Sequence, residues 1–447
     1  MIKVGSLRKQ GPRFGGSVGD VDPVLAFNPD AYWNLAANRS LTGQVGGLTF
    51  THTRASASGA FVGEDGLWTT VATDEPVFHY DPVTLESLGL RLERTAATNL
   101  LLSSEDLRPA GAGNPITAWT QIRASISADA ADDPYGTTLA DTLIEDSSNN
   151  SHFVFQSTTK AASSLAYTLS CAASPEGRDW IRLQASEGPN GAFAYFNVST
   201  GDVGTTGTIG TGFAVTGTEV EGPINGLYRV ALKLTTNSAT SLSGVVLLAD
   251  ADNSFSYQGD GVSGVNIIAA QLQQSTVLLS YVKTTTATVT RASEVATVAD
   301  SGYDTAMTLA ARGRYKGVGA DRVIASLSNG GNNFTHEIFY FSAALTTRGR
   351  TFDNGGAAQA AVTAGSVTVG QFHTVVYSAA ENDFLCSLDG QAPGTDTSGT
   401  MPSGLNVLTL GARGSGGTLG LDDTIAWIAT FKRNLSSAEA QLLSAVE

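Results

Sequence analysis

The run YRVALKL at residues 228–234 alternates strictly between two kinds of side chain. Its tyrosine, valine and two leucines fall on one side, and Arg229, Ala231 and Lys233 fall on the other. Successive side chains of a β-strand point to opposite faces, so this period of two predicts a strand with one buried and one wet face. A similar strand is expected in DFLCSLDG at residues 383–390, which runs into an Asp-Gly pair suited to a tight hairpin turn.

The composition agrees with a β-rich chain. Fifty glycines, three methionines and 15% charged residues are typical of short strands and turns rather than of helices. At 447 residues the chain exceeds what one hydrophobic core organises, so two or three domains are expected. We predict an all-β chain of tandem jelly-roll or β-sandwich domains, with a β-rich N-terminal region. Ser436 and Glu439 have capping-box spacing and predict a short C-terminal helix that packs Ala440, Leu442 or Leu443 on a sandwich.

The net charge of the chain is −15, with 41 acidic and 26 basic residues, which opposes binding to nucleic acid. The first 30 residues run against this balance, because they carry basic residues and no acid before Asp20. We predict that this segment docks on a complementary surface, with an ordinary frayed terminus as the alternative. The predicted docking residues are Lys3, Arg8, Lys9 and Arg13.

The two cysteines and the hydropathy place further limits on the chain. Cys171 and Cys386 lie in different predicted domains without metal-binding or redox spacing, so we expect both to be free and buried. No apolar run is long enough to span a bilayer, and the N-terminus lacks the order of a secretory signal. We expect neither membrane insertion nor export by a cleaved leader.

Two patterns could carry chemistry, and neither leads us to predict a catalytic residue. GGSVG at residues 15–19 has the spacing of a hydrolase nucleophile elbow, but it lacks the strand before it and the helix after it. Glu219 and Glu221 alternate as the two acids of a glycosidase could, yet Gly217 and the pair at 222–223 flank them and predict a solvated loop. The five histidines are scattered, with no pair at metal-ligand spacing.

Oxygen-rich turns are the only candidates for a metal. Asp250, Asp252 and Asn253, and the pair at 422–423, offer the oxygen ligands that Ca²⁺ takes. Asp and Asn are also the common turn residues, so we predict structural turns, with structural calcium as the alternative and no other cofactor. Glycines recur every third residue over 201–210 without prolines, which we interpret as a flexible strand connection rather than a collagen-like helix.

Several longer stretches are distinctive as a set. They are LTFTHTRA at 48–55, EPVFHYDP at 75–82, GLRLERTAATNLLLS at 89–103, YFNVSTG at 195–201 and QLQQSTVLLSYVKTTTATVTR at 271–291. Together they resemble a recurrent module in the fibre and head-spike proteins of tailed bacteriophages. The chain departs from that module at 94–97, where it has RTAA and the module more often has Pro-Ala-Arg.

The resemblance implies a division of the chain into four parts. These are a docking arm at 1–30, a β-rich collar at 31–102, a carbohydrate-binding-module-like sandwich at 103–299 and a second sandwich at 300–447. The last part is similar to laminin-G and concanavalin-like lectins through residues 383–390 and GLDDTIAWIA at 420–429.

This module serves in binding or display and is not known for catalysis. The resemblance therefore implies a non-enzymatic virion protein, a head-spike or tail-fibre subunit assembled in the host cytoplasm. Such a subunit would join other virion proteins through its N-terminus and display its sandwiches to host surface polysaccharide. Fibres of this kind imply a homo-oligomer. The alternatives are a glycan depolymerase and a capsid decoration protein that binds no glycan.

Sugar binding on such modules needs exposed aromatic faces. Most aromatic side chains in strands are core or cross-strand neighbours, and that is the alternative for each candidate. The residues predicted to bind glycan are Trp180, Tyr195, Tyr257, Tyr315 and Tyr340.

Overall fold

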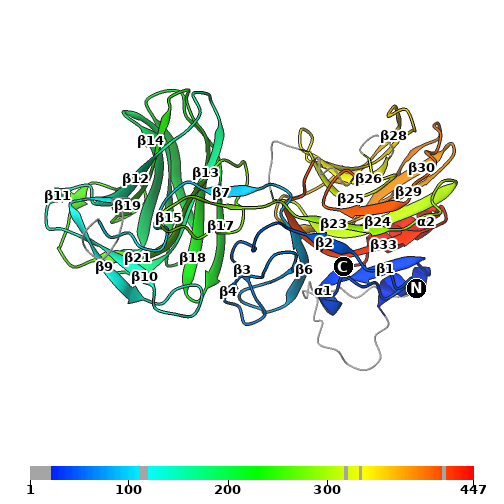
Figure 1. The fold of residues 1–447 in the computed structure, drawn as a ribbon. Coiled ribbons are helices and arrows are strands. Elements are labelled where there is room, and N and C mark those ends of the chain that lie inside the picture. Colours follow the sequence, from blue (N-terminus) through cyan, green and yellow to red (C-terminus); the bar gives the residue numbers. More distant parts are fainter. Residues whose placement is uncertain (1–21, 110–118, 317–320, 332–334, 415–418) are drawn as a thin grey trace, which may run out of the picture.

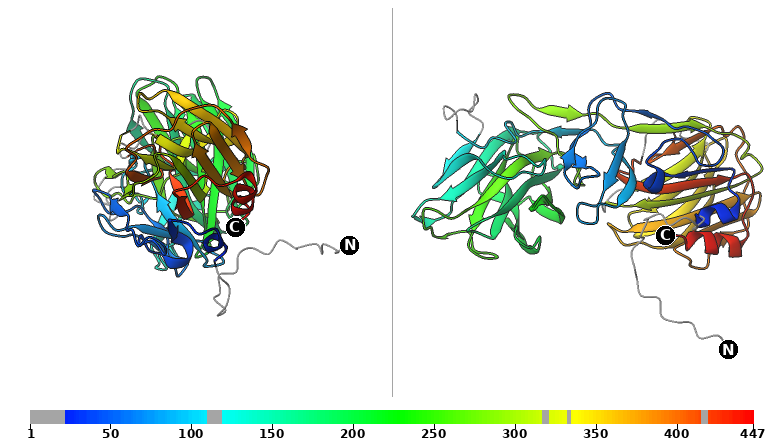
Figure 2. Two further views of the ribbon diagram at one scale, coloured as in Figure 1. Left: turned by 90° about the vertical axis from the view of Figure 1, so that its right-hand side faces the viewer. Right: turned by 90° about the horizontal axis from the view of Figure 1, so that it is seen from below.

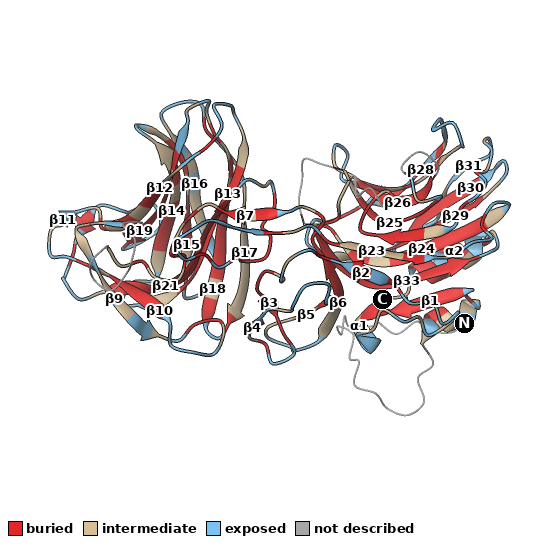
Figure 3. Ribbon diagram, viewed as in Figure 1, coloured by how far each residue is buried: buried red, intermediate tan, exposed pale blue. Residues whose placement is uncertain are grey.

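The computed structural model describes residues 22–109, 119–316, 321–331, 335–414 and 419–447. Nearly all of its regular structure is antiparallel β-strand, arranged as two sandwiches that lie end to end (Figure 1, Figure 2). In Figure 3 the strands are largely buried, and the exposed residues gather in the connections and at the strand ends. The predicted all-β fold is confirmed.

The first sandwich packs two six-stranded sheets around one apolar core. Leu183 and Phe196 of one sheet and Val230 and Leu272 of the other belong to this core. The strand order of one sheet is β17 (Ala214–Ile224), β18 (Leu227–Thr235), β13 (Ala166–Glu176), β21 (Gly264–Gln273), β10 (Ala140–Glu145) and β9 (Ala124–Ala131). The order of the other is β16 (Val203–Ile209), β15 (Asn190–Asn197), β14 (Trp180–Glu187), β19 (Ser241–Ala249), β12 (Phe153–Thr159) and β8 (Thr120–Ile122). The short strands β11 (Asn149–Asn150) and β20 (Tyr257–Gln258) pair with each other.

The second sandwich packs an eight-stranded sheet against a seven-stranded one. The larger sheet runs β31 (Gly394–Asp396), β30 (Asp383–Leu388), β29 (Phe372–Ala380), β24 (Ala306–Arg314), β33 (Asp423–Phe431), β6 (Ser87–Leu92) and β5 (Val77–Tyr80), with β1 (Ala31–Asn34) also paired to β33. The other runs β2 (Thr51–Thr53), β23 (Val295–Ala299), β32 (Val407–Leu410), β25 (Arg322–Ser328), β26 (Thr335–Phe341), β27 (Thr346–Phe352) and β28 (Ala358–Ser366). Two short helical turns, η1 (Pro23–Phe27) and α1 (Leu35–Asn38), flank β1.

Residues 31–102 do not form the separate collar that we predicted. β1 pairs with β33, β6 and β5 extend the same sheet, and β2 pairs with β23, so most of these strands belong to the second sandwich. The hairpin of β3 (Phe61–Val62) and β4 (Trp68–Thr69) instead packs in a cluster with side chains of the first sandwich. β7 (Ala97–Asn99) then pairs with β22 (Val289–Arg291) where the chain passes between the sandwiches (Figure 1).

Two local predictions in the second sandwich are confirmed. Asp389 and Gly390 follow β30 with φ values of 46° and 74°, the positive values that a tight hairpin turn requires. Helix α2 (Ser437–Ser444) begins with a complete capping box of Ser436 and Glu439. Ala440 and Leu443 are buried under it, whereas Leu442 is 64% exposed.

The predicted wet face of residues 228–234 is covered. These residues form β18, and Val230, Leu232 and Leu234 lie in the core as expected. Arg229 and Ala231 on the opposite face are also buried, and Trp68 of the β3–β4 hairpin lies over Arg229, whereas Lys233 is partly exposed. The period of two predicted the strand correctly, but the cover on its outer face comes from distant segments.

Candidate functional site

Residues of the stretches that carry the family resemblance meet in a buried charge cluster between the sandwiches. Arg54 donates to Glu294 Oε1 at 2.7 Å. Arg91 and Arg291 approach the Glu93 carboxylate at 2.6 and 3.0 Å. Burial opposes ionisation of Glu93, but these two arginines outweigh it and hold the pKa of Glu93 well below its usual range. The cluster fixes the geometry of the junction, which is a structural role.

Residues 94–97 (RTAA), where the chain differs from the phage module, lie in the same region. Arg94 donates to the backbone oxygen of Glu294 at 2.7 Å. The backbone N–H and the hydroxyl of Thr95 each donate to the Asp422 carboxylate at 2.7 Å. Arg322 pairs with the same carboxylate at 2.8 Å, so this stretch ties the junction to the second sandwich.

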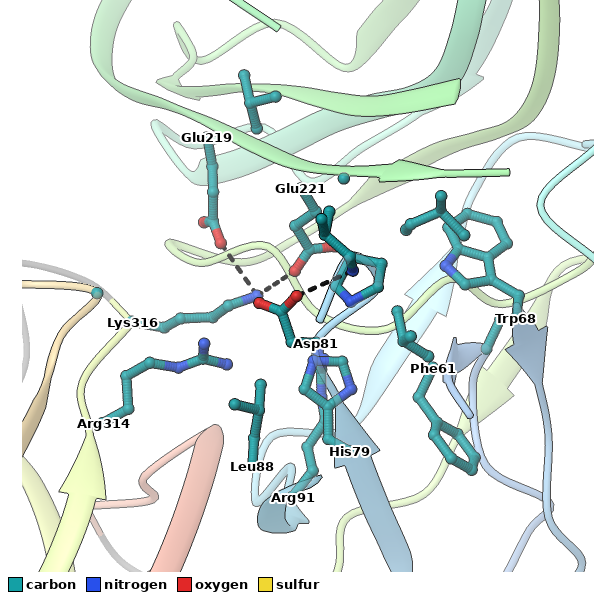
Figure 4. Close-up of a pocket in the computed structure, with 18 of the residues that line it drawn as sticks. Phe61, Trp68, His79, Asp81, Leu88, Arg91, Glu219, Glu221, Arg314 and Lys316 are labelled. Carbon is teal, nitrogen blue, oxygen red and sulfur yellow. Dashed lines mark hydrogen bonds and ion pairs between the residues drawn. The ribbon is translucent and has the colours of Figure 1, made fainter. Parts of the chain in front are cut away.

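A pocket of about 460 Å³ lies where the two sandwiches meet (Figure 4). Glu219 and Glu221 line it from β17 of the first sandwich. Arg314 at the end of β24, Lys316 just after it and His79 of β5 line it from the second. Pockets of about 300–1,000 Å³ at domain interfaces are common ligand sites, so this pocket is one candidate site.

Ion pairs cross the pocket from one sandwich to the other. Lys316 Nζ lies 3.0 Å from Glu219 Oε1 and also pairs with Glu221. Lys233 approaches Glu219 at 3.3 Å, and Arg229 approaches Glu221 at 3.3 Å. Each acid therefore has two cationic partners.

Glu219 and Glu221 correct our prediction of a solvated loop pair, because both lie on strand β17 and are only partly exposed. Burial alone would raise the pKa of Glu221, but Lys316, Arg229 and Arg91 outweigh it and hold the pKa well below its usual range. The general acid of a glycosidase must instead keep its proton near neutral pH. The charges around Glu221 thus keep its carboxylate ionised and oppose its use as a general acid.

A second candidate site is the outer face of the sheet that contains β14. Ile181, Leu183 and Ala185 of β14 point into the core. The residues between them face the other way, together with aromatic side chains from neighbouring strands, and we call this surface the aromatic face. It comprises Trp180, Arg182, Gln184, Phe193, Tyr195, Phe153 and Phe155, with Phe255 from the loop after β19.

Arg182 supports the aromatic face from beneath. Its guanidinium lies 4.0 Å from the ring centroid of Phe193 and 4.3 Å from that of Phe255, so it is held between two rings. It donates to Gln184 Oε1 at 2.7 Å and to Tyr195 OH at 3.4 Å. Arg182 is 3% exposed, whereas Phe255 is 37% exposed. The arginine positions the rings, and the rings meet solvent.

The glycines of β16 make room for this face. A Cβ added at Gly204 would lie 2.7 Å from a ring atom of Trp180, and one at Gly207 would lie 2.8 Å from a ring atom of Phe193. Gly201, which lies just before β16 and three residues before Gly204, likewise leaves space for the ring of Tyr228. Our interpretation of 201–210 as a flexible connection was wrong, because residues 203–209 form the edge strand β16, which has one register shift and whose glycines receive aromatic rings.

Four of the five predicted glycan-binding residues are buried and present no open face. Tyr315 and Tyr340 pack against each other in the second core with ring centroids 4.8 Å apart. Tyr257 donates to Glu145 at 2.6 Å, and Tyr195 lies in the aromatic face beneath solvent-exposed neighbours. Trp180 alone is partly exposed.

Sequence reasoning missed the phenylalanines of the aromatic face. Phe153 and Phe155 of β12 and Phe193 of β15 are partly exposed although they lie in central parts of a sheet. The alternation in FVFQ at 153–156 was the available signal, because Val154 between the two phenylalanines is a core residue. The sequence could not show which of the two faces was left open.

Asp252 and Asp423, two of the acidic turn residues, have protein partners. Asp252 accepts from the backbone N–H and the hydroxyl of Thr205 at 2.8 and 2.9 Å, and Asp423 pairs with Arg314 at 2.9 Å. Within the described ranges, no group of three or more His, Cys, Asp or Glu side chains could hold a metal ion. Cys171 and Cys386 are free and buried in separate cores, as predicted.

Two sequence predictions fall outside the described residues. They are the docking residues Lys3, Arg8, Lys9 and Arg13, and the GGSVG run at 15–19. Among the parts of the chain that the structure describes, no helix is both long and apolar enough to cross a membrane.

No protein-family model and no curated protein sequence matches the chain. Among solved structures, it is similar to the CBM40 module of a Ruminococcus gnavus sialidase, with a TM-score of 0.28, 16% identity, and 32% of this chain and 84% of that one covered. For Trypanosoma rangeli sialidase in complex with sialic acid, the TM-score is 0.26, the identity 13%, and the coverage 68% and 60%. For mouse laminin α1 domains LG4-5 these values are 0.21, 10%, 74% and 95%. At this level of similarity none of the three identifies what the chain does.

Proposed function

We propose that the chain is a glycan-binding structural protein of a tailed-phage or phage-like particle, a head-spike or tail-fibre subunit assembled in the host cytoplasm. The observation that carries the glycan-binding part is the aromatic face. The virion part rests on the resemblance of the five sequence stretches. In this proposal the N-terminal segment joins other virion proteins, and the sandwiches face host surface polysaccharide.

The chemistry of the aromatic face suits a sugar chain. Pyranose rings carry C–H groups on one face and hydroxyls at the edge, so they pack on aromatic rings while nearby amides satisfy the hydroxyls. Phe193 and Phe155 supply partly exposed rings, and Gln184 lies between them across the strands. Affinity at each site can be weak, because many copies on one particle raise the effective concentration.

Retention of the purified chain on bacterial capsule and lipopolysaccharide arrays tests the glycan-binding proposal. We expect Phe193→Ala to weaken retention about tenfold, because an aromatic contact contributes about 0.5–1.5 kcal/mol beyond the area it buries. Val262→Ala is the control, since Val262 is 75% exposed on a loop of the same sandwich. Equal retention of wild type and Phe193→Ala would remove the aromatic face from the proposal. Shortened saccharides in the supernatant would contradict a non-enzymatic function.

Incorporation into particles tests the virion proposal separately. We expect a chain lacking residues 1–21, which keeps Asp22 and the buried Val24 of η1, to fold, to keep its retention on glycans and to be missing from assembled particles. Normal incorporation of this truncated chain would exclude docking through Lys3, Arg8, Lys9 and Arg13.

A further inference from the structure

The pocket between the sandwiches has features of a ligand site that are independent of the aromatic face. It is built from both sandwiches, with Thr218, Glu219 and Glu221 from the first and His79 and Lys316 from the second. A molecule bound there would contact both bodies at once.

Apart from Asp81, whose Oδ1 atom accepts from the backbone N–H groups of Val83 and Thr84, the acids and cations that line the pocket lie in ion pairs. Lys316 forms ion pairs with Glu219 and Glu221, and Arg314 lies 2.9 Å from its partner Asp423. Arg91 lies 2.6 Å from Glu93. A charged ligand would have to break one of these pairs and leave a poorly solvated charge without a partner, which is costly. A neutral ligand with both donors and acceptors could add hydrogen bonds to the pairs without breaking them.

His79 supplies a polar ring at the pocket wall. The residue is 8% exposed, and its Nδ1 atom is covered by protein with no hydrogen-bond partner among the described residues, so only the rest of the ring is open to a ligand. Burial, together with the nearby Arg91 and Arg314, lowers the pKa of His79 well below its usual value, so the imidazole is neutral. A neutral imidazole has one N–H donor and one nitrogen acceptor, and a hydroxyl group can pair with either kind, so the uncovered edge of the ring suits a hydroxyl in both tautomers.

The opposite wall of the pocket is apolar. Phe61 and Trp68 lie across the pocket from Glu219 and Lys316 (Figure 4), and Val62 and Ile224 also line the pocket. Trp68 is held in place by stacking on Tyr281, with ring centroids 5.6 Å apart. The pocket therefore presents one apolar wall and one wall of closely spaced donors and acceptors.

We propose that this pocket binds a single neutral sugar ring, with its hydroxyl edge toward Glu219, Lys316 and His79 and its C–H face toward the apolar wall. The bound ring connects the two sandwiches. Neutral polyhydroxyl rings match the pocket because they present donors and acceptors along one edge and carry no net charge.

Saturation-transfer NMR on the full chain tests this proposal with free glucose, galactose, mannose, rhamnose and N-acetylglucosamine. Each neutral sugar is compared with a charged derivative of the same ring, such as glucuronic acid and glucosamine for glucose. We expect transfer to at least one neutral sugar and binding at least tenfold weaker for the charged counterpart of the same ring. Absence of transfer to all five neutral sugars, or equal binding of a charged one, would overturn the proposal.

Variants place the signal in the pocket. We expect His79→Phe and Leu88→Trp each to weaken binding of the neutral sugar at least tenfold. Leu88 is a partly exposed residue that lines the pocket (Figure 4), so Leu88→Trp fills the pocket even if His79→Phe fails to fold. Val262→Ala, at an exposed residue that does not line the pocket, should leave this binding unchanged. Full binding by Leu88→Trp would exclude the pocket, whereas loss of binding in Phe193→Ala would assign the signal to the aromatic face.

Discussion

At the scale of single residues, His336 shows how burial changes an ionisable group. It is fully buried in the second sandwich, with a hydrogen bond of 2.7 Å between its Nδ1 and Thr351 Oγ1. Burial lowers the pKa of His336 from 6.5 to about 3. Between these two values the unfolded chain binds a proton that the folded chain does not bind, so protonation favours unfolding.

We predict that His336→Gln flattens the pH dependence of stability. The stabilisation linked to a neutral His336 is complete above pH 6.5 and is lost as the pH falls toward 3, at up to about 1.4 kcal/mol per pH unit. Free energies of unfolding measured in denaturant between pH 7 and pH 5 should therefore fall more steeply in wild type than in His336→Gln. Thr351→Val keeps the buried imidazole and should keep the wild-type slope. Parallel profiles for wild type and His336→Gln would contradict this account.

At the scale of elements, β16 shows that glycine in a strand can serve packing. Valine has a higher strand propensity than glycine. Propensity alone therefore predicts that any Gly→Val substitution in β16 stabilises the strand. The rings of Trp180 and Phe193 occupy the space that a Cβ would need at Gly204 and Gly207. Residues 203–209 form a paired strand, with one register shift, although their sequence is rich in glycine.

We predict that Gly207→Val destabilises the first sandwich by about 1–3 kcal/mol, because the added side chain overlaps the Phe193 ring and forces it to move. Chemical denaturation followed by circular dichroism measures the change. Thr208→Val is the matched control on the same strand, since Thr208 is exposed, and it should be neutral or slightly stabilising. Stabilisation by Gly207→Val would show that the ring does not depend on this glycine.

At the scale of the whole molecule, ion pairs that cross the junction hold the two sandwiches in one arrangement. Lys316 of the second sandwich meets Glu219 and Glu221 of the first, and its side chain is only 9% exposed. Removing one partner from a buried pair leaves the remaining charge poorly solvated.

We predict that Lys316→Met lowers the free energy of unfolding by about 1–3 kcal/mol, because Glu221 keeps its charge and loses a cation. Adding Glu221→Gln to Lys316→Met should recover part of this loss, which the double-mutant cycle measures. The depressed pKa of Glu221 stabilises the fold above the usual carboxylate pKa and ceases to do so at acid pH, so the difference between wild type and Lys316→Met should shrink toward pH 3. Additive effects of the two substitutions would contradict the coupling.

Much of the local structure could be predicted from short stretches of the chain. The period of two in 228–234, the Asp-Gly turn at 389–390 and the capping box at Ser436 each depend on neighbours within a few residues. Such patterns encode backbone geometry, so they were sufficient for the strands, the turn and the final helix.

The tertiary structure alone decided what covers each outer face. Arg229 is buried, Glu221 lines a pocket and Phe193 is left open, although all three lie on strands of similar pattern. The contacts responsible join distant residues: Lys316 and Glu221 are 95 positions apart, and Arg54 and Glu294 are 240 positions apart. Alternation specifies that a strand has two faces, whereas the exposure of each face depends on which remote segment packs against it.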